Sequence, residues 1–92
     1  MVTRSVEVTN ALGLHARAAA RFVHLAARFT SQIRVSRDSK VMDGKSIMGI
    51  LLLAAARGTV LTISADGSDE AIAVDSLIEL VKSGFGEESW NG

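Results

Sequence analysis

The sequence predicts a small α+β domain, a two-layer open-faced sandwich in which a four-stranded antiparallel sheet carries three helices on one face. Short stretches alternate apolar and polar residues and are bounded by turn residues, which is typical of strands. Longer stretches carry apolar residues at helical spacing. The segments follow one another in the order βαββαβα, and helices packed on one face of a mostly antiparallel sheet define this architecture.

The expected strands are short and either alternating or β-branched. They are Val2–Val8, Gln32–Arg37, Lys40–Met42 and Thr59–Ser64. In the second of them, Ile33 and Val35 face one way and the polar residues the other. Arg37-Asp38-Ser39 is a tight turn between the second and third strands.

The expected helices are Ala16–Phe29, Ile47–Ala56 and Asp69–Lys82. The first has an inward-facing stripe consisting of Phe22, Val23, Ala26 and Phe29. The second is closed by Arg57, with Gly58 as the C′ residue.

The third helix begins after an N-cap at Ser68, and its acidic first turn suits the positive end of the helix dipole. It ends at Gly84. Its predicted buried residues are Val74, Leu77, Ile78 and Val81.

The length of 92 residues limits the chain to one domain, and no internal repeat or linker interrupts it. We expect a folded domain over residues 1–86 and a disordered tail over 87–92, with Trp90 exposed. The absence of cysteine excludes disulfides and thiolate metal sites and fits a reducing cytoplasm. Without a signal pattern or an 18-residue apolar run, we expect a soluble cytoplasmic protein with no membrane insertion.

The formal net charge is zero, but the charges are unevenly distributed. Residues 1–57 have an excess of six positive charges, and residues 58–92 an equal negative excess. A basic half suits a phosphoryl group and an acidic protein partner. On charge alone, two ordinary solvated faces of opposite sign explain the pattern as well.

The stretch Gly13-Leu14-His15-Ala16-Arg17 places a histidine where the first helix begins. The first backbone N–H groups of a helix are unpaired and its dipole is positive there, so this end attracts anions. The positive surroundings favour a neutral imidazole, which is nucleophilic. The Arg17 guanidinium suits phosphate oxygens. His15 is thus a candidate phosphoryl acceptor, although a lone histidine before a helix is also consistent with a polar loop residue.

Three motifs together resemble the HPr family, the histidine phosphocarriers of the phosphoenolpyruvate-dependent phosphotransferase system. The first is Gly13 to Arg17 followed by an alanine-rich helix, the second is Gly44-Lys45-Ser46-Ile47-Met48-Gly49, and the third is Thr62 to Gly67 leading to Asp69-Glu70. The resemblance as a whole spans about residues 2 to 85, nearly the whole chain. The family usually has proline after the arginine, where this chain has Ala18. Alanine preserves helix initiation but leaves the transfer rate and the choice of partner open.

The resemblance implies a carrier rather than an enzyme. Enzyme I, charged from phosphoenolpyruvate, would pass a phosphoryl group to Nδ1 of His15, and the carrier would donate it to an enzyme II A domain. Arg17 and the backbone N–H of Ala16 would hold the phosphoryl oxygens. The branch served, sugar or nitrogen-related, stays open. No cofactor is implied, and we expect a monomer.

The resemblance also implies a regulatory phosphorylation at Ser46 by a serine kinase or phosphorylase, whose existence the sequence does not reveal. From the residues alone, Ser46 is a helix N-cap. The second helix is apolar almost all round, so part of it must face water or a partner. Carried over from the family, the partner contacts are Arg17, Arg21, Ile47, Met48 and Leu51. Gly49 permits close approach of a partner or of a neighbouring helix.

Other functions are weighed against this one. A regulatory adaptor of the same fold, acting through Ser46 and the apolar helix, stays open because of Ala18. A nucleic-acid module needs stacking aromatics on strands, which this chain lacks, so we expect no nucleic-acid partner. Gly44-Lys45-Ser46 is similar to the end of a phosphate-binding P-loop, but that motif needs a glycine five residues earlier, where this chain has Ser39. His24 lies in the middle of the first helix, away from an anion-binding helix end, and is interpreted as a surface or boundary residue. No residue spacing predicts a metal site.

Overall fold

The computed structural model describes residues 1–86 of the chain, so the tail expected at 87–92, with Trp90, lies outside the described residues. The elements follow the predicted order, with a short 3₁₀ turn, η1, added at the end. They are β1 (Val2–Glu7), α1 (Ala16–Ala26), β2 (Gln32–Arg37), β3 (Lys40–Asp43), α2 (Ile47–Leu52), β4 (Val60–Asp66), α3 (Glu70–Lys82) and η1 (Gly84–Gly86).

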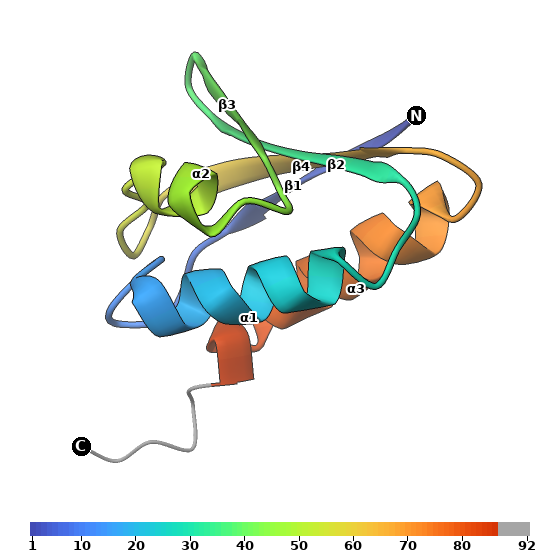
Figure 1. Ribbon diagram of the computed structural model, residues 1–92. Coiled ribbons are helices and arrows are strands. Elements are labelled where there is room, and N and C mark those ends of the chain that lie inside the picture. The colour runs from blue at the N-terminus through green and yellow to red at the C-terminus, as the bar shows by residue number, and fades with distance from the viewer. Residues whose placement is uncertain (87–92) are drawn as a thin grey trace.

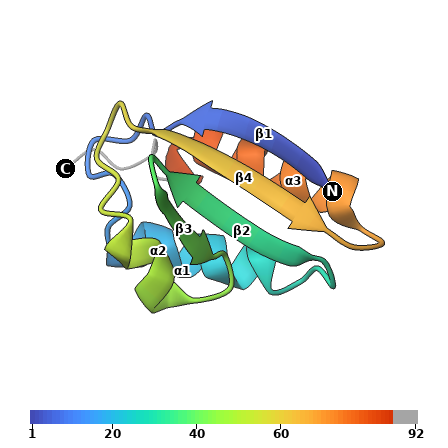
Figure 2. The ribbon, with the colours of Figure 1, turned by 90° about the horizontal axis from the view of Figure 1, so that it is seen from above.

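The four strands form one antiparallel sheet in the order β1-β4-β2-β3, which Figure 2 shows from above. In the register of the central pair, Val35 lies opposite Ile63, and Val6 on the outer strand lies opposite Leu61. All four side chains are buried, so the inward faces of the strands align. The predicted fold class is confirmed.

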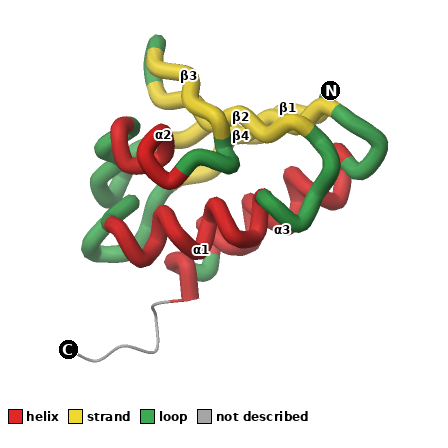
Figure 3. The backbone as a smooth tube through the Cα atoms, viewed as in Figure 1, coloured by secondary structure: helices red, strands yellow, loops and turns green. Residues whose placement is uncertain are grey.

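The helices cover one face of this sheet, as Figures 1 and 3 show with α1 and α3 side by side beneath it. The core between the layers is aliphatic, with Phe22 and Phe85 as its two phenylalanines. Predicted helix residues in this core are Phe22, Val23, Ala26, Val74, Leu77, Ile78 and Val81. Phe29 is only half-buried. Ala18 is fully buried in the first turn of α1, so the helix starts normally without the proline.

The first two helices are shorter than predicted. After α1, the amides of Arg28 and Phe29 donate to Leu25 and Ala26, because the chain is already turning toward β2. α2 stops at Leu52 because Ala54 takes a left-handed conformation with φ of 50°. Gly58 is therefore not the C′ residue of this helix.

At the far end of the molecule the start of α3 also differs from the prediction. The N-cap is Asp69 rather than Ser68, and the Asp69 carboxylate makes no capping bond within the helix. It binds the segment after α1 instead, as described below. β4 runs two residues beyond the predicted Ser64, because Ala65 and Asp66 pair with β2. The predicted end at Gly84, with φ of 68°, is confirmed.

No helix within residues 1–86 is long and apolar enough to cross a membrane.

Candidate functional site

The loop between β1 and α1 lies against the segment that joins α2 to β4 (Figure 1). The amide of Leu14 donates to the carbonyl of Ala55 over 2.9 Å, and Leu14 itself is buried. Gly13, with φ of 65°, approaches so closely that a Cβ there would lie 2.5 Å from the same carbonyl oxygen. The side-chain amide of Asn10 donates to the Gly13 carbonyl over 2.9 Å. These contacts fix the last turn before His15.

His15 is the N-cap of α1. Its backbone is extended (φ −76°, ψ 178°), and its carbonyl accepts the first helical bond from Ala19 over 2.9 Å. Its ring nitrogen Nδ1 accepts a hydrogen bond from the Arg17 amide over 3.3 Å. The prediction that His15 stands at the start of a helix is confirmed.

This geometry distinguishes the two ring nitrogens of His15. A nitrogen that accepts a hydrogen bond carries a lone pair, so in the neutral imidazole the proton resides on Nε2. The Nδ1 lone pair is directed at the helix N-terminus, where the dipole and the first-turn amides of Ala16 and Arg17 stabilise negative charge. An anion attached to Nδ1 would therefore meet donors without any rearrangement of the backbone.

The arginines predicted around this histidine differ in their surroundings. Arg17 is exposed on the first turn of α1. Arg21, one turn further, is half-buried, and its guanidinium donates to the carbonyl of Phe85. His24 is exposed near the end of the same helix, which matches its interpretation as a surface residue.

The apolar helix α2 divides into a buried and an exposed side. Ile50 and Leu53 are fully buried, whereas Ile47 and Met48 are 41% and 67% exposed. Leu51, predicted as a partner contact, is half-buried and packs against the core. Gly49 has no close helix beside it, because a Cβ there would meet Met42 and Ser46 at an ordinary 3.4 Å.

Two further exposed apolar residues lie in the loop before His15 and on α2. Leu12, in the loop before His15, is 66% exposed, and Leu52 on α2 is 55% exposed. Leu52 lies one helical turn after Met48, but Leu51 has the same spacing from Ile47, so periodicity alone does not single out Leu52. Leu12 carried a different signal, since it is a large apolar residue within a stretch of turn residues.

Ser46 is the N-cap of α2, as predicted. Its hydroxyl oxygen accepts from the Gly49 amide over 3.1 Å, and the residue is half-buried. The Asp43 carboxylate accepts from the Lys45 amide over 2.9 Å and shapes the turn before the helix. The Lys45 ammonium donates to the Phe29 carbonyl over 2.7 Å, so the turn is anchored to the segment that follows α1.

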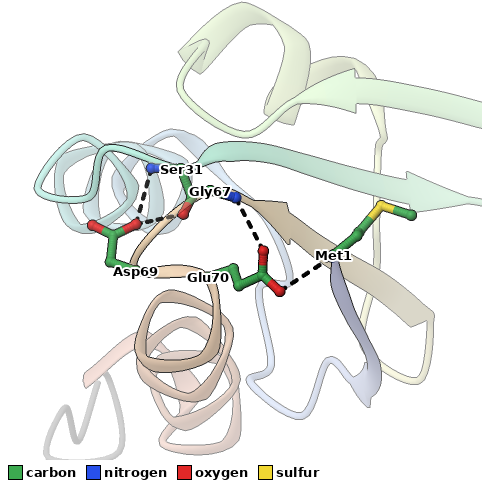
Figure 4. Close-up of polar contacts among 5 residues, drawn as sticks. All are labelled: Met1, Ser31, Gly67, Asp69 and Glu70. Carbon is green, nitrogen blue, oxygen red and sulfur yellow. Dashed lines mark hydrogen bonds and ion pairs between the residues drawn. The ribbon is translucent and has the colours of Figure 1, made fainter.

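The strongest pKa shift lies away from His15, where α3 begins (Figure 4). The Ser31 hydroxyl and the Thr30 and Ser31 amides donate to Asp69 and hold its pKa at about 2, below the ordinary 3.8. Glu70 accepts from the Gly67 amide and pairs with the Met1 amino group, and both lower its pKa. These contacts join three segments and explain why Asp69 does not cap its own helix.

Within residues 1–86, no group of three or more histidine, cysteine, aspartate or glutamate side chains is arranged to hold a metal ion.

Fold and site together define a class of protein: a small α+β sandwich that presents a histidine at the N-terminus of a surface helix. A family model described as the phosphorylation site of the phosphotransferase HPr component matches residues 2–83. The chain therefore belongs to the HPr family of phosphocarriers. The phosphocarrier protein HPr of Neisseria meningitidis is 46% identical over 87 residues, which cover 95% of this chain and 98% of that protein.

Other relatives extend this comparison. The crystal structure of an HPr from Thermoanaerobacter tengcongensis has a TM-score of 0.92 and 48% identity, covering 96% of this chain and 99% of that one. An HPr dimer from the same organism has a TM-score of 0.76 at 47% identity, covering 95% and 100%. The HPr-like protein Crh of Halalkalibacterium halodurans is 44% identical over 82 residues, or 89% and 98% of the two chains.

Proposed function

We propose that this chain carries a phosphoryl group on Nδ1 of His15, accepting it from phosphorylated enzyme I and donating it to an enzyme II A domain. The observation that supports this most directly is the position of Nδ1, which already accepts the Arg17 amide at the start of α1. Membership of the HPr family supports the carrier class and these partners.

The transfer needs little from the carrier. The Nδ1 lone pair attacks phosphorus, the bond from phosphorus to the donor atom of enzyme I breaks, and the bonding electron pair stays with that donor atom. The phosphoryl oxygens then accept the hydrogen bond that the Arg17 amide donated to Nδ1. The Ala16 amide and the Arg17 guanidinium donate to these oxygens as well. Because His15 is only half-buried and Arg17 is exposed, the group stays accessible to the next acceptor.

The partner enzymes would dock over the exposed apolar side of α2 and the start of α1. Ile47 and Met48 supply adaptable apolar contact beside the site, and Leu51 supports them from its half-buried position. Arg17 and Arg21 attract an acidic partner. We propose that the carrier works as a monomer. Sedimentation equilibrium tests this, because the mass of a dimer at micromolar concentration would contradict it.

The function is tested by incubating the protein with phosphoenolpyruvate and an active enzyme I and measuring its mass and acid lability. We expect one acid-labile phosphoryl group in the wild type and in His24→Ala, and none in His15→Ala. His24 is the matched control, since it is the other histidine and lies on the same helix. A wild-type protein that gains no mass would refute the proposal.

Regulation at Ser46 is a second proposal, favoured by its position as the N-cap of α2 beside the docking surface. A phosphate there would add a charge of about −1.5 to −2 and repel an acidic partner while suiting the helix end. The alternative of a regulatory adaptor of the same fold would act through the same serine.

The Ser46 proposal is tested with Ser46→Asp and Ser46→Ala. Aspartate keeps the cap, so we expect wild-type stability but slower phosphorylation by enzyme I. Alanine removes the cap and costs about 1 kcal/mol of stability without adding charge. Equal phosphorylation rates for Ser46→Asp and wild type would contradict regulation through charge.

A further inference from the structure

Arg37, at the end of β2, reaches across to the end of α2. The two hydrogens of its Nη1 donate to the carbonyls of Leu53 over 2.9 Å and of Ala54 over 3.0 Å. The last carbonyls of a helix have no partner within the helix, so a guanidinium here takes the place of a backbone cap. Figure 2 shows the end of β2 beside α2 and the segment that follows it.

The turn at Ala54, which Arg37 contacts, is disfavoured by the residue type at that position. Ala54 has φ of 50°, a left-handed conformation that glycine adopts freely and alanine does not. Ala54 is exposed between the buried Leu53 and Ala55, so its own side chain gains no packing that would offset this cost. The Ala54 amide donates to the Leu51 carbonyl over 3.0 Å, and the bonds from Arg37 hold the two carbonyls on either side of the turn.

Ala55, the residue after this turn, contacts the loop that precedes His15. The Ala55 carbonyl accepts the Leu14 amide over 2.9 Å, and the close approach of Gly13 leaves no room for another position. Leu14 directly precedes His15. A shift of the turn at Ala54 would move the acceptor on which the N-cap histidine depends.

We propose that Arg37 is a positioning residue for His15: it fixes the left-handed turn after α2 and thereby the Ala55 carbonyl that holds the histidine loop. This inference rests on the proposed transfer through His15 and adds a residue to it. Arg37 touches neither the imidazole nor the phosphoryl group in this role.

The experiment compares Arg37→Gln with Arg34→Gln, an exposed arginine on the opposite face of the same strand. We expect Arg37→Gln to lower the maximal rate of phosphorylation by enzyme I about tenfold with little change in KM. We also expect amide exchange of Leu14, measured by NMR, to rise about tenfold. Arg34→Gln should match the wild type in both.

A rescue variant separates positioning from general loss of stability. Glycine at position 54 adopts the turn without the guanidinium, so Arg37→Gln combined with Ala54→Gly should recover most of the rate and of the Leu14 protection. All variants are measured at a temperature where circular dichroism shows them folded.

The outcomes distinguish the two proposals. A phosphorylated wild type with unchanged rate and Leu14 exchange in Arg37→Gln overturns the role of Arg37 alone. A loss that Ala54→Gly does not rescue also overturns it. A wild type that takes no phosphoryl group overturns the proposed function and this role with it.

Discussion

At the scale of single residues, Arg17 and His15 illustrate how little side-chain chemistry a carrier needs. The imidazole nitrogen, one backbone amide and one exposed guanidinium lie within three consecutive residues. The sequence predicts their place at the start of α1 correctly, because every signal is local: a glycine, a cap position and an alanine-rich helix.

Replacing Arg17 with glutamine should slow phosphorylation without affecting the fold. A hydrogen bond to a charged group contributes about 1.5–3 kcal/mol, so we expect a rate about 10- to 100-fold lower by quench-flow with enzyme I. Arg28→Gln, an exposed arginine near the end of the same helix, is the control and should retain the wild-type rate. Equal rates for the two variants would show that the Arg17 guanidinium does not bind the phosphoryl oxygens.

Residue-level signals fail where partners are distant in the sequence. Arg37 donates hydrogen bonds to Leu53 and Ala54, sixteen and seventeen positions away, and the local sequence pattern of β2 does not predict these bonds. In α2, Leu51 and Leu52 are indistinguishable by periodicity because the helix has no polar side. Only the packing shows Leu51 half-buried and Leu52 exposed.

At the scale of elements, the ends of helices depend on tertiary contacts. Ser68 is a good N-cap by composition, yet Asp69 takes that place because its carboxylate is held by the Thr30 and Ser31 amides. A tertiary contact also lies at the end of α2. The alanine-rich continuation of this helix favours further helix, but the carbonyls of Leu53 and Ala54 accept hydrogen bonds from Arg37. Propensity therefore predicts where helices exist better than where they stop.

The Asp69 contacts should make stability depend on pH. Because the folded state lowers the pKa of Asp69 from 3.8 to about 2, its contribution is complete above about pH 5 and is lost as pH falls through 2. We expect Asp69→Asn to be less stable than wild type at pH 7, with the difference shrinking between pH 5 and 2 in urea unfolding.

Ser68→Ala is the control for the Asp69 experiment. Since Ser68 does not cap α3, this variant should follow the wild-type stability curve at every pH, offset by less than about 0.5 kcal/mol. A pH-independent gap between wild type and Asp69→Asn would show that the carboxylate charge contributes nothing through these bonds.

The left-handed turn after α2 gives a second prediction at this scale. Ala54→Gly should raise the free energy of unfolding by about 1 kcal/mol, because glycine removes the cost of the positive φ at an exposed position. Ala20→Gly, within α1, should do the opposite and destabilise by about 1 kcal/mol. Urea unfolding measures both, and a loss of stability in Ala54→Gly would contradict the account of the turn.

At the scale of the whole molecule, the charges and the sheet order place the site. The basic first part of the chain contains α1 and α2, and the acidic remainder contains α3. The strand order β1-β4-β2-β3 brings the segment before β4 against the loop after β1, so residues far apart in sequence support His15. The fold class is predictable from the alternation and spacing of apolar residues, whereas this contact is a consequence of topology.

The uneven charge distribution predicts that docking is sensitive to salt. Raising ionic strength from 0.01 M to 0.1 M shortens the Debye length from about 30 to about 10 Å, so attraction between Arg17 and Arg21 and an acidic surface on the partner weakens. We expect the second-order rate constant of phosphorylation to fall several-fold over this range, while stability changes little. A rate constant that does not respond to salt would assign docking to the apolar surface alone.

The central claim is that Nδ1 of His15, the nitrogen directed at the start of α1, receives the phosphoryl group. ¹⁵N-labelled protein, phosphorylated with phosphoenolpyruvate and enzyme I, should show phosphorus coupling and a shifted resonance at Nδ1 of His15. Coupling to Nε2 of His15, to a ring nitrogen of His24, or to no histidine at all would contradict the account.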